Sequence, residues 1–291
     1  MHQQRLDGLG AFCFVILLIP AIPFPARADL IAIEPVADNT LYEDASGELS
    51  NGAGTAMFAG RNSSLSESIR RAVVRFDVAA AIPAGAVIDS VSLQLTNSAA
   101  NIDDAEVTLH RLTTDWGVGN SIAGGNQGSG APAAPGDATW LHTFYDTNFW
   151  SAPGGDFDEA VTASAIVGGP GDAIWNSTPS FVADVQSFLD DPLIDFGWIV
   201  IGNETEAGTA KRFATREDAD AVIRPLLTIE YTPVPEPGSL TLLAMGVAGA
   251  LAVRRRSIRL SSGHAVFQLS LQEEPTPCVN ADRQEETLVT H

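Results

Sequence analysis

The feature that most restricts this 291-residue chain is a three-part segment near its carboxyl end, VPEPGSLTLLAMGVAGALAVRRR. Pro235 and Pro237 fix their own backbone torsions and keep their predecessors extended, so no strand of the preceding domain continues through them. The apolar part, counted generously from Gly238 to Val253, has 16 residues, and a cluster of arginines follows it. A stable membrane span needs roughly 20 residues, and arginines favour the cytoplasmic side of a bilayer. The segment therefore suits transient membrane insertion better than permanent anchoring.

These three parts, in this order and spacing, resemble a PEP-CTERM sorting signal. The residues that carry the resemblance are Val234, Pro235, Glu236 and Pro237, then the apolar stretch, then Arg254, Arg255 and Arg256. The resemblance implies that an exosortase, a membrane protease-transpeptidase, reads the segment and removes the tail during export. Such signals end soon after the basic cluster, whereas here residues 257–291 follow, an atypical polar tail that we expect to be unstructured. An ordinary single-span anchor with a cytoplasmic tail is the alternative.

The amino end carries the pattern of a secretory signal peptide. Arg5 stands in a short polar region, an apolar run extends from Ala11 to Phe24, and Ala26 and Ala28 are the small residues that signal peptidase inspects. We expect cleavage before residue 29. The predicted organisation is a signal peptide (1–28), one β domain (29–233), a sorting signal with a short hydrophobic helix (234–256) and a tail (257–291).

The predicted domain is strongly acidic and has no cysteine. Residues 29–233 contain 29 Asp and Glu against 9 Lys and Arg, a net charge of −20, while Cys13 and Cys278 lie outside this range. Such a surface repels nucleic acid and anionic lipid. Disulfides and thiolate metal sites are excluded, so we expect the hydrophobic core alone to hold the domain.

Alternating apolar residues predict several half-buried strands. Residues 71–78 place Ala72, Val74, Phe76 and Val78 on one face, and 88–95 and 106–112 alternate in the same way. Apolar residues 196–201 predict a central strand that is covered on both faces, and 210–216 and 226–231 predict two more strands.

Thr178-Pro179 and helical spacing predict one short helix that ends near Asp190. The glycine-rich residues 117–136 have too little apolar surface to offset their ordering entropy and predict a long surface loop. These elements predict an all-β fold, an antiparallel β-sandwich of jelly-roll-like form.

An ordered series of segments across the domain also resembles a DNRLRE-type domain. The segments are 38–42, 70–77, 83–93, Trp116, 138–140, 183–186, 212–217 and 224–231. The stretch 212–217 reads RFATRE, where Thr215 replaces a serine that is common in the family. The resemblance implies an extracellular β-sandwich, and some relatives are classed as carbohydrate-binding modules for acidic polysaccharides such as alginate.

The sequence offers little for catalysis. The domain has only two histidines, no cysteine, and no nucleophile-elbow, zinc-protease or P-loop pattern, so we expect no enzyme activity. We interpret His110 as a solvated surface residue and His142 as a packed or loop residue. Three acidic groups, 103–104, 156–159 and 190–191, contain oxygen ligands that calcium prefers, although none has EF-hand spacing. We predict no cofactor and keep a structural calcium ion as an alternative.

The few positive charges suggest a binding surface for an acidic glycan. Arg71 and Arg75 lie on one predicted strand, and Lys211, Arg212 and Arg216 on another, so adjacent strands would form a basic strip. Guanidinium groups suit sugar carboxylates, and Trp140, Tyr145 or Trp150 suit stacking on sugar rings. The alternatives are that Arg71 and Arg75 pair with Asp77, Glu217 or Asp218 and only hold the sheet surface together, and that the aromatics belong to the core.

Two functions follow from these patterns. The first is a non-enzymatic exported protein that reaches the cell envelope or extracellular matrix and acts there as a structural or adhesive unit. The second is a binding module for an acidic extracellular polysaccharide. Signal peptidase and exosortase are the expected partners during export, and no nucleic-acid partner is expected.

Overall fold

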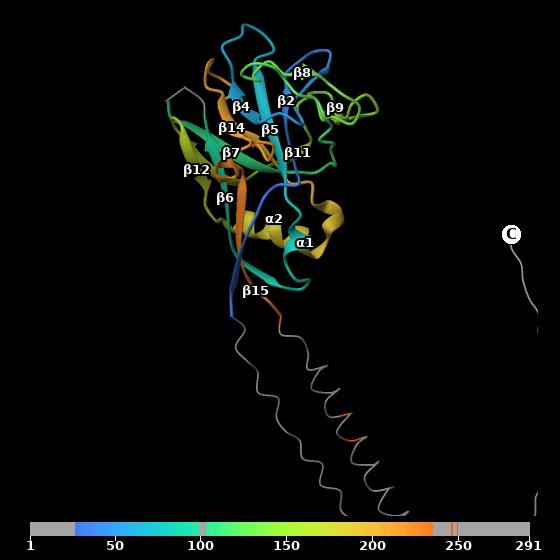
Figure 1. The fold of residues 1–291 in the computed structure, drawn as a ribbon, viewed down its shortest axis with the longest axis vertical. Coiled ribbons are helices and arrows are strands. Elements are labelled where there is room, and N and C mark those ends of the chain that lie inside the picture. The colour runs from blue at the N-terminus through green and yellow to red at the C-terminus, as the bar shows by residue number, and fades with distance from the viewer. Residues whose placement is uncertain (1–26, 99–102, 235–245, 247–248, 250–291) are drawn as a thin grey trace, which may run out of the picture. The chain divides into compact units, whose positions relative to one another are not determined.

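The computed structural model describes residues 27–98 and 103–234, together with Gly246 and Gly249, and the regular structure of these residues is mostly β (Figure 1). The chain divides into two units, with the boundary between Pro235 and Glu236. The strands of the large sheet are β1 (Asp29–Ile33), β2 (Ala37–Tyr42), β4 (Ala56–Arg61), β5 (Ile69–Arg75), β6 (Val87–Asn97), β7 (Ala105–Leu112), β11 (Phe157–Val167), β12 (Gly171–Trp175), β13 (Trp198–Ile201), β14 (Lys211–Ala214) and β15 (Leu226–Thr232).

These eleven strands form one antiparallel sheet with the main order β1-β15-β6-β14-β4-β5-β13-β7-β11. In addition, β12 pairs with β6, and β2 pairs with β5. Two small two-stranded sheets accompany it: β3 (Leu49–Ser50) with β8 (Ala131–Pro132), and β9 (His142–Phe144) with β10 (Asn148–Phe149). The prediction of a mostly β, antiparallel fold is therefore confirmed.

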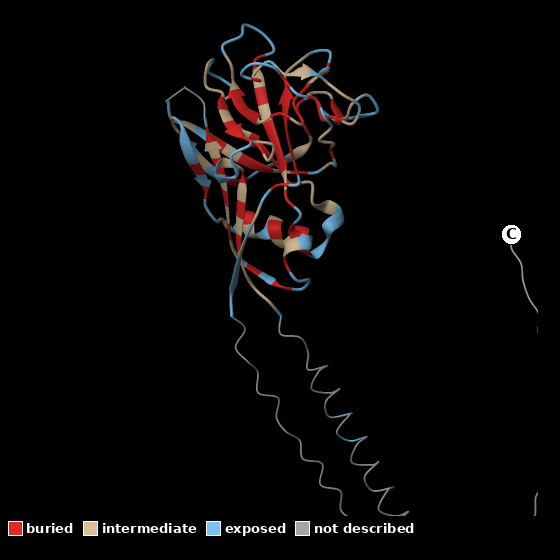
Figure 2. Ribbon diagram, in the orientation of Figure 1, coloured by how far each residue is buried: buried red, intermediate tan, exposed pale blue. Residues whose placement is uncertain are grey.

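The main core lies where strands distant in the sheet order face one another (Figure 2). Leu227 of β15, Leu93 of β6 and Leu109 of β7 are all fully buried in the same cluster. The indole N–H of Trp175 in β12 donates to the carbonyl of Val107 in β7 at 2.8 Å, although β12 pairs with β6. The sheet thus curves around a shared apolar interior, and the predicted inward residues of 88–95 point into it.

Helix α2 (Pro179–Asp190) closes one side of this core, as its sequence predicts. The Thr178 hydroxyl accepts from the amide of Phe181 at 3.0 Å, and Pro179 occupies the first turn, where a missing N–H costs nothing. The buried side chains of α2 are Phe181, Val185, Phe188 and Leu189. Two short 3-10 helices, η1 (Pro192–Ile194) and η2 (Ala221–Ile223), lie in the connections that follow.

The predicted strand 71–78 is corrected in two respects. It ends at Arg75, because the Asp77 side chain accepts from the amide of Ala80 at 3.0 Å and starts the short helix α1 (Val78–Ala81), so the domain has more than one helix. It is also buried on both faces: Ala72 packs into the main core, while Val73 is fully buried in a second cluster on the opposite face.

The second core shows why β13 is central. Trp198 and Val200 enter the main core, whereas Ile199 joins the second cluster, so this strand is covered from both sides as predicted. Trp116 and Trp150, from the chain between β7 and β11, complete the second cluster. A layer of irregular chain therefore covers a sheet face that alternation alone assigned to solvent.

Residues 117–136 belong to this covering layer, and they are held by polar contacts. The Asn51 side chain accepts from the amide of Ala123 at 2.7 Å and donates to Gln127 at 3.2 Å, and the Tyr42 hydroxyl donates to the carbonyl of Gln127 at 2.8 Å. The segment has few apolar side chains to offset the entropy cost of ordering it, and these buried hydrogen bonds offset that cost instead. The prediction of a loop holds, but the segment is partly buried.

The two ends of the described domain leave it side by side. Asp29 at the start of β1 pairs with Tyr231 near the end of β15, and both Ala28 and Val234 are exposed (Figure 1). Ala26 and the sorting residues from Pro235 to Arg256 lie outside the described residues, apart from Gly246 and Gly249, which are helical. In the described part of the chain, no helix is both long enough and apolar enough to cross a membrane.

Candidate functional site

The structure does not bring the five predicted basic residues into one strip. Strand β4 lies between β5 and β14 in the sheet order, so the two arginine-bearing strands are not adjacent. Along β14, alternation sends Lys211 to the side of the buried Phe213, and Arg212 to the opposite side. Lys211 is fully buried, and its ammonium group donates to the carbonyl of Gly168 at 2.9 Å. Burial lowers the Lys211 pKa, although nearby Asp103 and Asp104 raise it.

Three of the predicted arginines are neutralised by carboxylates. The ion pairs are Arg71 with Glu204 at 2.7 Å, Arg75 with Asp115 at 2.6 Å and Arg216 with Glu217 at 2.7 Å. Ion pairing therefore describes these three residues, although Arg71 and Arg75 pair with Glu204 and Asp115 and not with the acids expected from the sequence. Each of these charges is balanced by a carboxylate of the domain, so none of the three arginines presents an uncompensated cation to a ligand.

The predicted aromatic residues differ in exposure. Trp140 is partly exposed, and the Arg71 guanidinium lies 5.1 Å from its ring centre. Tyr145 is partly exposed and packs edge-on against the buried His142. Trp150 is buried, and its indole N–H donates to the carbonyl of Thr139 at 2.9 Å. Trp140 and Tyr145 keep surface for contacts, whereas Trp150 belongs to the second core.

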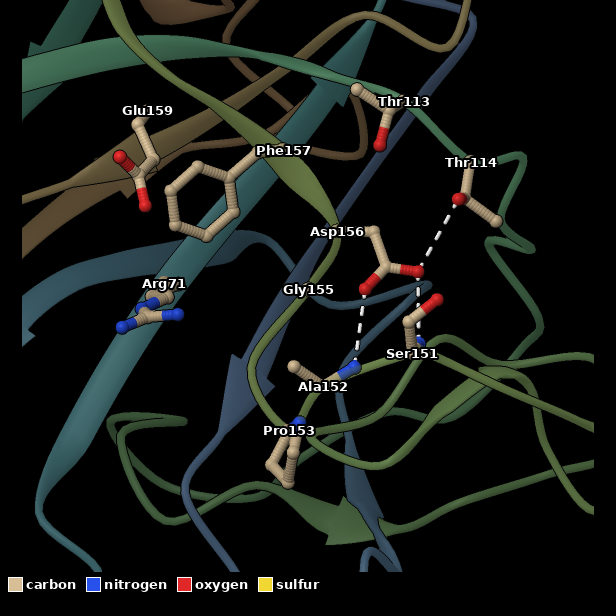
Figure 3. Close-up of a pocket in the computed structure, with 10 residues that line it drawn as sticks. All are labelled: Arg71, Thr113, Thr114, Ser151, Ala152, Pro153, Gly155, Asp156, Phe157 and Glu159. Carbon is tan, nitrogen blue, oxygen red and sulfur yellow. Dashed lines mark hydrogen bonds between the residues drawn. The ribbon is translucent and has the colours of Figure 1, made fainter.

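A pocket of about 460 Å³ opens beside Arg71 (Figure 3). Asp156 points at the 151–152 backbone, where it accepts from the amides of Ser151 at 2.9 Å and Ala152 at 3.2 Å. Arg71 and the Phe157 ring form another part of the wall, and the carboxylate of Glu159 also lines the pocket. Since Arg71 is already paired, the remaining charges are negative. This pocket suits neutral or cationic groups rather than acidic ones.

A second pocket, of about 410 Å³, has the opposite charge balance. It lies among β4, β5 and β14 and is lined by two arginines, Arg70 and Arg212, with Phe58, Ser98 and Asn126 beside them. Its lining contains no acidic residue. Arg212 is one of the predicted site residues, whereas Arg70 is not. The sequence does indicate Arg70, because it precedes Arg71 on the same strand. Neighbouring residues of a strand point to opposite faces, so Arg70 must lie on the face opposite Arg71.

The two histidines of the domain are both packed. His110 is only 8% exposed, and its ring nitrogens contact the Asp158 carbonyl at 3.0 Å and the Thr108 hydroxyl at 3.1 Å. The interpretation of His110 as a solvated residue is wrong, because the edge strand β11 and the ring of Phe157 cover it. His142 is packed as expected, with its ring 3.0 Å from the Thr139 hydroxyl.

The acidic groups considered for calcium serve local structure in the described residues. Asp156 holds the 151–152 turn, Asp190 accepts from Gln186 at 3.0 Å, and Asp191 caps η1. Within residues 27–98 and 103–234, no three His, Cys, Asp or Glu side chains are placed together to hold a metal ion.

Comparison with known families adds one assignment. Residues 233–256 match the PEP-CTERM protein-sorting motif. The match starts directly after β15 and covers the proline pair, the apolar stretch and the three arginines that the sequence singled out. This motif implies sorting by an exosortase system and export to the cell envelope or extracellular space. No curated protein matches the chain.

Proposed function

We propose that this protein is a non-enzymatic structural or adhesive unit of the cell envelope or extracellular matrix. The observation that carries the proposal is the position of the sorting motif: it starts at residue 233, one residue after the last strand of a compact β domain. An exosortase that cuts at this motif would release the domain with its sheet complete. The domain itself is a jelly-roll-like β-sandwich of DNRLRE type in this proposal, which the shared core of β6, β15, β7 and β13 supports.

The arrangement of the two ends supports processing on both sides. Ala28 is exposed next to the first residue of β1, and Val234 is exposed shortly after β15. We infer that signal peptidase cuts after Ala28 and that exosortase removes the tail, so that neither cut breaks a core contact. The polar groups described above also favour a non-enzymatic role, because Asp156, Asp190, His110 and His142 bind backbone and side-chain groups of the domain itself.

Deletion of residues 234–256 tests the proposal. We expect the full chain to reach the envelope or matrix fraction of the producing cells, and the deleted protein or a strain without exosortase to lose that location. As a matched control, deletion of an equal length from 257–291 should leave the location unchanged. Turnover of any member of a panel of glycans and esters by the purified protein would contradict the non-enzymatic role.

A second function, binding of an acidic polysaccharide, is favoured by the pocket that Arg70 and Arg212 line. Its acid-free lining is an exception in a domain with a net charge of −20, and such local positive fields attract polyanions. Binding of this kind weakens with salt, because exposed charges are screened beyond roughly 8 Å at physiological ionic strength. Retention on a polyuronate at low salt, lost at high salt and absent on neutral glucans, is the expected result.

A further inference from the structure

The basic residues of the domain fall into two groups. Of the nine in residues 29–233, five lie within 4.0 Å of a carboxylate. The other four form no ion pair in the described residues, and they are Arg61, Arg70, Lys211 and Arg212. All four lie on the neighbouring strands β4, β5 and β14. Lys211 is fully buried, so the charges without a carboxylate partner nearest the surface are the half-buried Arg61 and Arg212 and the 5% exposed Arg70.

Arg70 is held rigidly without a carboxylate. Its Nη1 donates to the carbonyls of Glu67 at 2.9 Å and Ile69 at 2.8 Å, its Nε donates to the carbonyl of Gly128 at 3.2 Å, and its guanidinium lies 4.9 Å from the Tyr42 ring centre. No described group accepts from Nη2, and Nη2 is not among the fully buried atoms that lack a partner. Arg70 is only 5% exposed and lines the pocket, and Nη2 is the nitrogen of its guanidinium that has no acceptor among the described residues.

Arg212 presents free donors to the same pocket from the neighbouring side. Its Nη1 donates to the Ser98 hydroxyl at 2.6 Å, and its Nε lies 3.4 Å from the carbonyl of Asn126. Its Nη2 has no acceptor among the described residues. Both partners are neutral, so they orient the guanidinium and leave its charge uncompensated.

The acidic residues nearest to Arg70 do not occupy the position of an anionic ligand in the pocket. Glu43, Glu67 and Asp44 act on Arg70 electrostatically, yet burial dominates and lowers the Arg70 pKa. Glu43 accepts from the amide of Ile69 at 2.8 Å, and Glu67 accepts from the amide of Ala45 at 2.9 Å. None of the three lines the pocket.

We propose that the pocket between Arg70 and Arg212 is a subsite for one carboxylate of an acidic sugar. The free Nη2 groups of the two arginines donate to the two carboxylate oxygens, and the amide and hydroxyl groups of Asn126 and Ser98 face the sugar hydroxyls. A planar carboxylate matches guanidinium donors, and the lining contains no acidic residue that would repel it. This proposal rests on the second function above, and it assigns that function to a different surface from the pocket beside Arg71.

The test compares two charge-matched variants of the full-length chain in non-ionic detergent. Affinity electrophoresis at low salt uses polygalacturonate, its fully methyl-esterified form, dextran sulfate and dextran as probes. Arg212→Gln should weaken polygalacturonate binding about tenfold or more, since a hydrogen bond to a charged group contributes on that order. Arg75→Gln removes the same charge at an ion pair outside the pocket and should change binding less than about twofold. Arg212→Lys keeps the charge, loses the planar donors and should give an intermediate loss.

The possible results distinguish a failure of the subsite proposal from a failure of the polysaccharide-binding function. Equal binding by wild type, Arg212→Gln and Arg75→Gln would overturn the subsite and leave polysaccharide binding intact. Binding of dextran sulfate in preference to polygalacturonate, or equal binding of the methyl ester, would overturn the carboxylate assignment. No retention of the wild type on any polyuronate would overturn the binding function and the subsite with it. If Arg212→Gln unfolds at the assay temperature, Arg212→Lys takes its place, and binding equal to that of the wild type would overturn the subsite.

Discussion

Asp195 shows how a single buried carboxyl makes this domain sensitive to pH. The residue follows η1 and packs beside α1, and one of its carboxyl oxygens is buried without a hydrogen-bond partner. Burial raises the Asp195 pKa from its ordinary 3.8 to about 7, against the opposing effects of the Val78 amide and the Arg75 charge. The neutral acid is therefore the form that suits the folded state.

Replacement of Asp195 tests this environment. Because the folded pKa is raised, the stability that the protonated acid confers is full below about pH 4 and is lost as the pH rises through 7. Relative to Asp195→Asn, the wild type should lose roughly 2–4 kcal/mol of unfolding free energy between pH 4 and pH 8. Urea unfolding at several pH values measures this difference. Parallel stability curves for the two proteins would show that Asp195 is ionised in the folded state.

Trp198 is the residue on which both the main core and α2 depend. Its ring contacts Phe76, Phe181 and Phe188, and its indole N–H donates to Asp184 at 3.0 Å. Trp198→Ala should cost on the order of 3–5 kcal/mol, whereas Phe149→Ala, at a residue that is 64% exposed, should cost under about 1 kcal/mol. Chemical denaturation measures both. Similar losses for the two variants would place β13 outside the core.

At the scale of elements, strands with clear alternation were predictable from sequence, and so was the proline-capped helix. Residues 88–95, 106–112 and 226–231 lie in β6, β7 and β15, and the helix begins at Pro179. The alternation of apolar and polar residues in a strand does not reveal a second layer of chain that covers its outer face. It assigned Val73 and His110 to solvent, because nothing in a strand's own pattern shows which outer face a distant loop covers.

The same reason explains the error at the candidate site. The basic residues of two strands form one surface strip only if the strands are neighbours in the sheet. The order of strands depends on long-range pairing, which no local sequence pattern specifies. Strand β4, with the short apolar run 56–59, separates them. Alternation along 211–214, which reads KRFA, does place Lys211 and Arg212 on opposite faces, so this part of the geometry could be predicted from the sequence.

The covering layer yields a prediction about Asn39 of β2. Its side chain donates to the Ser50 hydroxyl at 2.9 Å and to the carbonyls of Val118 at 3.3 Å and Ala138 at 3.4 Å. Asn39→Ala removes these hydrogen bonds and the acceptor of the buried Asn51 amide, which lies 3.1 Å from the Asn39 oxygen, and should cost roughly 2–4 kcal/mol. It should also make residues 117–136 more sensitive to limited proteolysis.

The exposed Asn148 supplies the matched control, because its side chain makes no hydrogen bond to the described residues. Asn148→Ala should change neither stability nor cleavage. If Asn39→Ala left the cleavage pattern of 117–136 unchanged, polar anchoring of the layer would be excluded.

At the scale of the whole molecule, the domain depends on its cores rather than on crosslinks. Residues 29–233 contain no cysteine, while two hydrophobic clusters and a network of buried amides are present. Reductant should therefore leave the thermal unfolding midpoint of the protein from producing cells unchanged to within about 1 °C, since a native disulfide typically contributes 2–5 kcal/mol. A clear drop would mean that Cys13 or Cys278 remains in the protein and forms a disulfide.

The proposed function requires that the β domain is exported and then separated from its sorting segment next to β15. Intact mass and amino-terminal sequencing of the protein recovered from the producing cells would locate both cuts. We expect a chain that starts at Asp29 and ends between Val234 and Pro237, just beyond the last strand. A protein that still carries residues 240–291 would contradict it and identify the segment as a retained anchor.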